Sequence, residues 1–172
     1  MHSVQRVAAA AAFAVSIATS ALPVCAAEPA GAPSFSSDPQ VAAQQHQVYE
    51  VVHRYETLLN AGDTAGIMAM YAHDSVAEWN NRATFATPAE RKAAYDTLFK
   101  EAKFSTVFGY ASVDAWGDTG VVRTFHHKGA TVLESGKEVV DLNREVFVLR
   151  KIDGEWKIVL YIFNTDPVQG EG

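Results

Sequence analysis

An arginine within an aliphatic strand pattern is the position in this sequence that points most directly to binding. Arg144 alternates with aliphatic residues, which are Val140, Leu142, Val146 and Val148. Because alternate residues of a strand share one face, we expect its guanidinium to lie among these apolar side chains. A buried guanidinium needs an acceptor, since a lone buried charge is costly. Arg144 would therefore anchor an acidic or carbonyl oxygen of a ligand, or form an internal ion pair or a dimer contact.

The opposite face of the same strand is an alternative polar surface. It carries Asp141, Asn143, Glu145, Phe147 and Leu149. If this face looks inward, its first three residues could line a polar pocket. If it looks outward, they form a solvated row on the protein surface.

Asn164 and His127 are two further candidates. Asn164 ends an apolar row on the last expected strand, formed by Trp156, Ile158, Leu160 and Ile162. His126 and His127 point to opposite faces of a strand, and His127 shares its face with Phe125. His127 would therefore be the one to enter a pocket, and a packing or surface role is the alternative. No supporting ligand cluster accompanies it, so we predict no metal site.

Helix signals occupy the first half of the chain. Asp38-Pro39 is a typical helix start, and Gly62 is a typical end. A second, short helix is expected after Asp63, with apolar positions at Ile67, Met70 and Tyr71, followed by a short strand from Ser75 to Trp79. A third helix begins at Thr87-Pro88-Ala89-Glu90, where Glu90 completes a capping box.

After Lys103 the apolar pattern changes to a period of two residues. It predicts strands at 104–116, 121–132, 137–151 and 156–165, joined by turns at Gly117-Asp118, Ser135-Gly136 and Asp153-Gly154. Short turns make consecutive strands antiparallel neighbours. Helices followed by such a meander predict an α+β fold, in which helices cover one face of a curved sheet and leave a cone-shaped pocket.

The N-terminal segment is typical of a secretory signal peptide. Arg6 precedes an apolar run from Val7 to Ala18, and the small residues Cys25, Ala26 and Ala27 follow. We predict cleavage of residues 1–27, a flexible leader at 28–38, one domain at 39–167 and a tail at 168–172. The protein would then be periplasmic or secreted. An uncleaved anchor and a lipoprotein signal are the alternatives.

The composition of the chain excludes several classes of protein. The chain has 172 residues, 48% of them hydrophobic, which is enough for one packed domain. Its net charge of -6 argues against binding a nucleic acid backbone. The apolar run near the N-terminus is shorter than a bilayer span, so we expect no stable membrane insertion.

Two stretches give the chain its resemblance to a known superfamily. The first is YETLLNAGD at 55–63, continued by MYAHD at 70–74, and the second is DGEWKI at 153–158, followed by Asn164-Thr165. They resemble motifs of the NTF2-like superfamily, and within it of SnoaL-like and ketosteroid isomerase-like bacterial proteins. The resemblance covers residues 39 to about 167. It implies a cone in which three N-terminal helices pack on a curved antiparallel sheet, and a homodimer formed through the outer sheet face.

The resemblance also implies roles for individual residues. Tyr55 matches the tyrosine that donates a hydrogen bond to the enolate oxygen in ketosteroid isomerases, and a core tyrosine is the alternative. Trp79 falls where those enzymes carry the aspartate base, and an indole cannot abstract a proton. We therefore expect no steroid isomerisation of the usual mechanism, and we expect Trp79 to stack on a ligand or close the pocket.

Together these features predict a domain that binds a small apolar or carbonyl-bearing molecule without a cofactor. The expected pocket is lined by Tyr55, Trp79, Phe99, Arg144 and Asn164. The alternative is a metal-free enzyme of the SnoaL, isomerase, cyclase or dehydratase type, with Tyr55 and His127 as catalytic candidates. The two hypotheses differ in whether a base lies near Tyr55.

Overall fold

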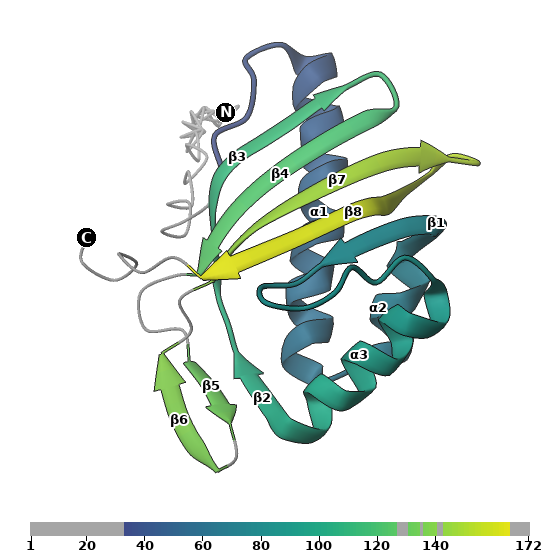
Figure 1. Ribbon diagram of the computed structural model, residues 1–172. Coiled ribbons are helices and arrows are strands. Elements are labelled where there is room, and N and C mark those ends of the chain that lie inside the picture. The colour runs from purple at the N-terminus through teal and green to yellow at the C-terminus, as the bar shows by residue number, and fades with distance from the viewer. Residues whose placement is uncertain (1–32, 127–130, 135, 141–142, 166–172) are drawn as a thin grey trace, which may run out of the picture.

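The structure of the protein is a computed structural model that describes residues 33–126, 131–134, 136–140 and 143–165. Helix α1 (Pro39–Ala61) packs behind a five-stranded sheet, and α2 (Thr64–Met70) and α3 (Pro88–Glu101) lie beside its far edge (Figure 1). The predicted α+β fold, with three helices against a mostly antiparallel sheet, is confirmed. No helix in these ranges is long and apolar enough to cross a membrane.

The helix boundaries follow the predicted capping residues. The Asp38 side chain accepts hydrogen bonds from the backbone N–H groups of Gln40 and Val41, and Asp63 accepts one from Gly66. Gly62 ends α1 with a φ angle of 65°, a left-handed conformation that favours glycine. Thr87 and Glu90 form the expected capping box of α3.

The main sheet has the strand order β1-β8-β7-β4-β3. Its strands are β1 (Tyr71–Glu78), β3 (Phe108–Trp116), β4 (Thr119–His126), β7 (Asn143–Ile152) and β8 (Glu155–Thr165). Strands β3, β4, β7 and β8 form the predicted antiparallel meander, whereas β1 pairs with β8 in parallel. The sequence pattern had placed Tyr71 among the apolar positions of the second helix, but α2 ends at Met70 and Tyr71 is the first residue of β1.

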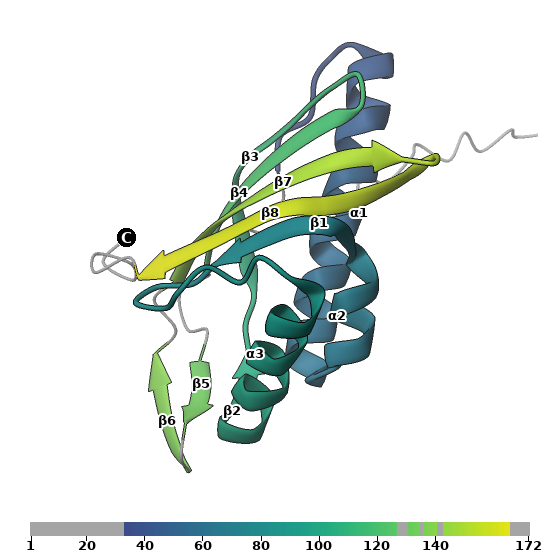
Figure 2. The ribbon, with the colours of Figure 1, turned by 45° about the vertical axis from the view of Figure 1, so that its right-hand side comes forward.

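Three of the predicted long strands are divided between two sheets. The strands β2 (Ala102–Ser105), β5 (Thr131–Glu134) and β6 (Lys137–Val140) form a separate three-stranded sheet (Figure 2). At the break between β2 and β3, the Asn60 side chain bonds both backbone groups of Thr106, each at 2.8 Å. Glu56 accepts from the N–H of Phe108 at 2.8 Å. Side chains of α1 thus replace the strand ladder where the chain changes sheet.

The expected leader is partly packed on the domain. Pro33 is buried, and the Phe35 ring lies 3.8 Å from that of His46, measured between centroids. The N–H of Ser36 donates to Gln45 Oε1 at 2.7 Å. The described part of this segment, residues 33–38, therefore covers the N-terminal half of α1. The predicted signal peptide lies outside the described residues.

The side chains of β7 face the opposite way from the arrangement that the aliphatic pattern favoured. Glu145, Phe147 and Leu149 are buried against the helices, whereas Arg144 is exposed on the outer face. Large aromatic side chains from both layers fill the interior, and the smaller valines cover the outer face. The reversed register that the sequence left open is the one adopted.

Strand β8 contains a bulge that changes which residues share a face. Leu149 pairs with Ile158 but Val148 pairs with Leu160, so Val159 is an extra residue between them. Ile158 and Tyr161 are consequently both buried. Asn164 lies on the outer face, opposite Arg144 in the pairing register, and not at the end of an inward row.

Candidate functional site

Three tyrosine hydroxyls form a chain of hydrogen bonds inside the domain. The Tyr95 hydroxyl lies 2.7 Å from that of Tyr55 and 3.0 Å from that of Tyr71. The three residues come from α3, α1 and β1, and all are buried. Tyr55 was the predicted member of this group. The other two bring their hydroxyls to it from elements distant in the sequence.

A buried carboxylate adjoins the tyrosine chain. Glu145 of β7 is 4% exposed and accepts hydrogen bonds from Tyr161 Oη at 2.9 Å and Thr124 Oγ1 at 2.6 Å. The Tyr161 and Tyr55 rings lie 5.2 Å apart between centroids. Tyr161 therefore connects the Glu145 carboxylate with the chain of tyrosine hydrogen bonds that has Tyr95 in its middle. The structure places a potential base near Tyr55, although not at position 79.

The buried tyrosines are held in their neutral form. Burial is the main cause that raises the pKa of Tyr55, Tyr71, Tyr95 and Tyr161 well above the usual value for a phenol. The nearby carboxylate of Glu145 raises the pKa of all four further, because it disfavours a second negative charge. At neutral pH these side chains are therefore hydrogen-bond donors and acceptors without charge.

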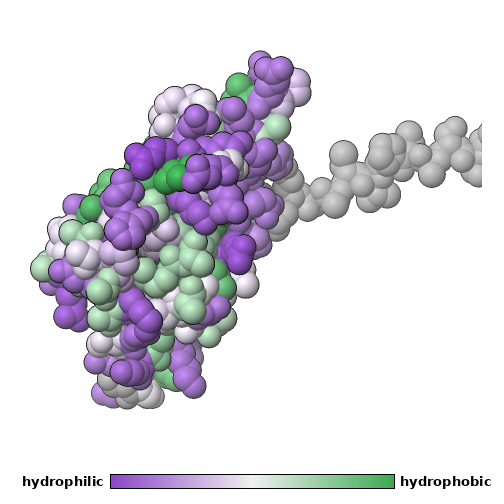
Figure 3. All heavy atoms as spheres, turned by 90° about the vertical axis from the view of Figure 1, so that its right-hand side faces the viewer, coloured by the Kyte–Doolittle hydropathy of each residue, from purple (hydrophilic) through white to green (hydrophobic). Residues whose placement is uncertain are grey.

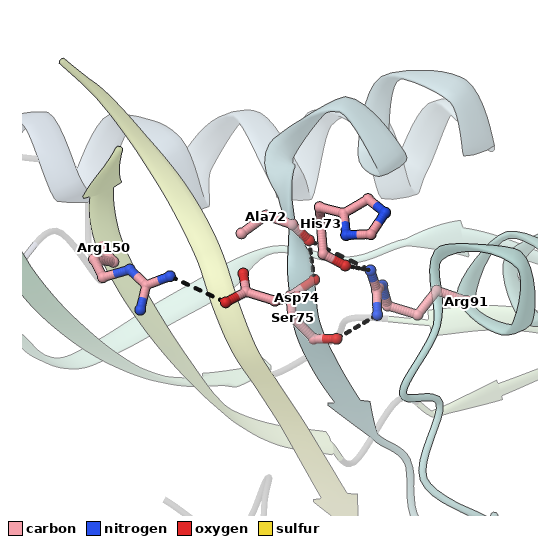
Figure 4. Close-up of polar contacts among 6 residues, drawn as sticks. All are labelled: Ala72, His73, Asp74, Ser75, Arg91 and Arg150. Atoms are coloured by element: carbon pink, nitrogen blue, oxygen red, sulfur yellow. Dashed lines mark hydrogen bonds and ion pairs between the residues drawn. The ribbon is translucent and has the colours of Figure 1, made fainter. Parts of the chain in front are cut away.

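Arg91 of α3 fixes the start of β1 beside this cluster. It is 1% exposed and donates to the carbonyl oxygens of Ser75, Ala72 and His73, as Figure 4 shows. Its guanidinium carbon lies 5.3 Å from the centroid of the Tyr71 ring. Burial lowers the pKa of Arg91. Arg91 thus connects α3 with the strand that carries Tyr71. A separate, exposed ion pair joins Asp74 of the same strand to Arg150 of β7, with 3.3 Å between nitrogen and oxygen.

Trp79 separates the tyrosine cluster from a surface pocket. The ring centroid of Trp79 lies 5.0 Å from those of Tyr95 and Phe85 and 5.8 Å from that of Phe163. Trp79, Phe85 and Phe163 line a pocket of about 650 Å³ between α3 and the loop after β1. The remaining lining residues are Asn80, Arg82, Ala83, Thr84, Glu90, Ala93, Ala94, Thr97, Leu98 and Glu101. We call this the α3 pocket.

The face that carries β1, α2 and α3 has a mixed surface. Figure 3 shows hydrophobic residues gathered in its middle, surrounded by hydrophilic ones.

The predicted site residues do not gather in a single pocket. Tyr55 lies in the buried cluster and Trp79 in the wall of the α3 pocket. Phe99 packs at 5.9 Å from the Tyr95 ring but lines a different hollow, of about 360 Å³, with Leu59 and Phe104. Arg144 and Asn164 lie on the outer face, where Arg144 Nε donates to Asn164 Oδ1 at 2.6 Å. His127 lies outside the described residues.

Four members of the buried cluster were not among the predicted site residues: Tyr71, Tyr95, Tyr161 and Glu145. Glu145 entered the sequence argument only through the reversed register. Tyr95 flanks the apolar stripe of its helix, and no local signal shows that its hydroxyl meets two others. In the described ranges, no three His, Cys, Asp or Glu side chains gather as metal ligands would.

Sequence comparison finds no protein-family profile and no curated protein that matches this chain. Comparison with solved structures does find proteins of similar architecture. A ketosteroid isomerase-like protein from Erwinia carotovora atroseptica aligns with a TM-score of 0.66 and 21% identity, covering 71% of this chain and 95% of that one. An NTF2-like protein with a cystatin-like fold from Novosphingobium aromaticivorans aligns at 0.60 and 19%, covering 75% and 86%.

An NTF2-like protein of unknown function from Pseudomonas putida aligns with a TM-score of 0.58 and 18% identity, covering 76% of this chain and 89% of that one. Identities this low establish shared architecture and leave the chemistry open. The fold that the sequence motifs implied is confirmed: the chain has the NTF2-like fold.

Proposed function

We propose that this protein is an exported domain that binds a small, mostly apolar molecule in the α3 pocket. The observation that carries the proposal is the wall formed by Trp79, Phe85 and Phe163. Aromatic rings supply a large apolar contact area with a defined shape. Arg82, Thr97 and Glu101 line the same pocket and supply polar groups that can orient a bound molecule.

The position of Trp79 argues against steroid isomerisation of the usual mechanism. Its indole stands where a carboxylate base would be expected, and its ring packs between the pocket and Tyr95. A ligand in the α3 pocket would therefore meet the indole before it met the tyrosine hydroxyls. Binding needs no base at this position, so the geometry favours binding over this reaction.

Native mass spectrometry of protein purified from its own host tests the proposal. We expect a small molecule to remain bound to the wild-type protein. Ala94→Trp would fill the pocket and should abolish the retained mass, because Ala94 lines it. Lys100→Trp adds the same side chain to an exposed position of α3 outside the pocket and should retain the mass. Wild-type protein without a ligand, or Ala94→Trp with one, would contradict the assignment.

A second function is favoured by the buried carboxylate. Glu145 lies within hydrogen-bond distance of Tyr161 Oη, and Tyr161 packs on Tyr55. In a metal-free enzyme of the isomerase type, Glu145 would take a proton from a carbon next to a carbonyl group and return it. A tyrosine hydroxyl would donate a hydrogen bond to the enolate oxygen.

Deuterium incorporation separates this alternative from simple binding. Ketones incubated with the protein in D₂O should exchange their α-protons faster than in buffer, and Glu145→Gln should remove the acceleration. Glu50→Gln makes the same change at an exposed position of α1 outside the α3 pocket, and is the matched control. Equal exchange rates with and without protein over a panel of cyclic ketones would exclude the reaction for those substrates.

A further inference from the structure

The indole N–H of Trp79 is a buried hydrogen-bond donor in the wall of the α3 pocket. Three buried side-chain atoms have no hydrogen-bond partner among the described residues, namely Trp79 Nε1, Arg91 Nε and Tyr110 Oη. Of these three residues, Trp79 lines the α3 pocket, whereas Arg91 and Tyr110 do not. An indole N–H only donates, so what it lacks is an acceptor. A buried donor without an acceptor is costly, and a bound group that supplied one would therefore be favoured.

The other side-chain donors of the pocket wall are already bonded or hydrated. Asn80 Nδ2 and Thr97 Oγ1 donate to oxygen atoms of the protein at 3.1 Å and 2.9 Å. The side chains of Arg82 and Thr84 are exposed, so water hydrates them. A ligand that bonds to an exposed donor replaces water and gains little. A ligand that bonds to Trp79 instead satisfies a donor that is shielded from water, so this residue has the larger effect on selectivity.

Two of the side chains that pack on the indole are half-buried and line the pocket themselves. Phe85 and Phe163 lie 5.0 Å and 5.8 Å from the Trp79 ring, measured between centroids. The backbone of Phe85 is fixed by two hydrogen bonds with Ala77, of 2.9 Å and 3.1 Å. Half-buried rings change rotamer more readily than core side chains do. A ligand can therefore reach the indole N–H when one of these two rings turns, without movement of the backbone or of the fully buried Tyr95.

We propose, on the basis of the binding function proposed above, that the α3 pocket selects molecules with an acceptor oxygen that bonds to the N–H of Trp79. The apolar body of such a molecule packs on the aromatic wall, and a carbonyl or ether oxygen meets the indole. The same skeleton with a donor in place of this oxygen, or with neither, leaves the N–H unpaired and binds more weakly.

Three bicyclic probes with one skeleton test this selectivity. At the same ring position 1-indanone carries a carbonyl oxygen, indane carries only hydrogen, and 1-aminoindane carries an ammonium group that only donates. Titrations followed by NMR should give 1-indanone a dissociation constant that is lower by about fivefold or more than those of the other two. Trp79→Phe removes the N–H and keeps an aromatic ring, so it should bind 1-indanone and indane equally. Trp156→Phe removes an indole N–H outside the pocket and should keep the wild-type preference.

The indole N–H signals of the wild-type protein report the bond directly. The chain has three tryptophans, so the other two serve as references. Trp156 Nε1 donates to Gln47 Oε1 at 3.0 Å, whereas Trp116 is 57% exposed. On saturation with 1-indanone the Trp79 N–H proton should move downfield, because a hydrogen bond deshields the donor proton. The two reference signals should stay in place, and indane, which has the same aromatic ring, should cause no such shift.

The outcomes of these measurements separate selectivity from binding itself. A smaller preference of the wild type for 1-indanone over indane would show that the pocket does not select an acceptor. A preference that persists in Trp79→Phe, or that leaves the Trp79 signal in place, overturns the role of the indole. Tightest binding of 1-aminoindane also overturns it and indicates selection by the carboxylates of Glu90 and Glu101. Absence of binding by all three probes at millimolar concentration overturns the selectivity too, whereas the binding function is decided separately by the mass retained in the wild type and lost in Ala94→Trp.

Discussion

The hydroxyl of Tyr95 is the midpoint of the buried tyrosine chain, with Tyr55 on one side and Tyr71 on the other. Tyr95→Phe should lower the free energy of unfolding by about 1–3 kcal/mol, because two buried hydroxyls lose a partner. Tyr110→Phe is the matched control, since its buried hydroxyl has no hydrogen-bond partner among the described residues. It should leave stability unchanged or raise it. Urea unfolding of both variants measures the difference, and equal losses would contradict the network.

The same tyrosines predict a loss of stability in alkali. Their pKa values are raised in the folded protein, and a phenol in the unfolded chain titrates near pH 10. Below pH 10 these tyrosines keep their protons in both the folded and the unfolded protein, so their full contribution to stability is present. Above it the unfolded chain loses protons that the folded protein retains, so stability falls by about 1.4 kcal/mol per pH unit for each such tyrosine.

Urea midpoints between pH 9 and pH 11.5 measure this slope. Tyr95→Phe should give a shallower slope than wild type, because it removes one of the groups. A midpoint that stays constant over the whole range would show that the hydroxyls titrate equally in both states.

At the residue scale, the sequence identified a residue of the polar cluster more successfully than it predicted which face of a strand a side chain occupies. Tyr55 was identified as a site residue from its place in a motif, and it does lie in the buried polar cluster. Arg144 was assigned to the interior because valines alternate with it. The valines instead cover the outer face, since Phe147 and Leu149 fill the interior beside Glu145. Both faces of β7 are apolar enough for either register, so the pattern alone could not decide.

At the element scale, Gly120 allows β4 to lie close to α1. A Cβ atom there would lie 2.7 Å from Cγ2 and 2.9 Å from Cγ1 of the fully buried Val48. Gly120→Ala should therefore lower the free energy of unfolding by about 1–3 kcal/mol through overpacking. The loss should be smaller in a Val48→Ala background, which provides the space. A double-mutant cycle measures this coupling, and strictly additive losses would contradict it.

Local signals located the helices, and long-range packing decided the strands. Asp38, Gly62 and Thr87 act within one turn of their own positions, so the sequence identifies them directly. The bulge at Val159 depends on the pairing of β8 with β7, and the break at Thr106 depends on Asn60 of a distant helix. Neither β7 nor Asn60 can be recognised as a partner from the sequence of the segment whose structure it changes.

At the scale of the whole molecule, the outer sheet face is where we expect the predicted homodimer to form. Val121, Val148 and Leu160 form a row across three strands and are only half-buried. Val148→Lys should convert the dimer to a folded monomer, because it places a charge in an apolar interface. Thr57→Lys adds the same charge to an exposed position of α1 and should remain dimeric. Light scattering after size exclusion measures the mass, and a monomeric wild type at micromolar concentration would contradict the prediction.

The parallel pairing of β1 with β8 has a consequence for biosynthesis. During translation, residues 71–78 leave the ribosome long before residues 155–165, which contain the strand that pairs with them in the main sheet. Tyr161, which donates to Glu145, also arrives with this last strand. The main sheet therefore cannot be completed before residues 155–165 have been made. Until then the edge of β1 that pairs with β8 is unpaired, and an unpaired strand edge is prone to pair with other chains.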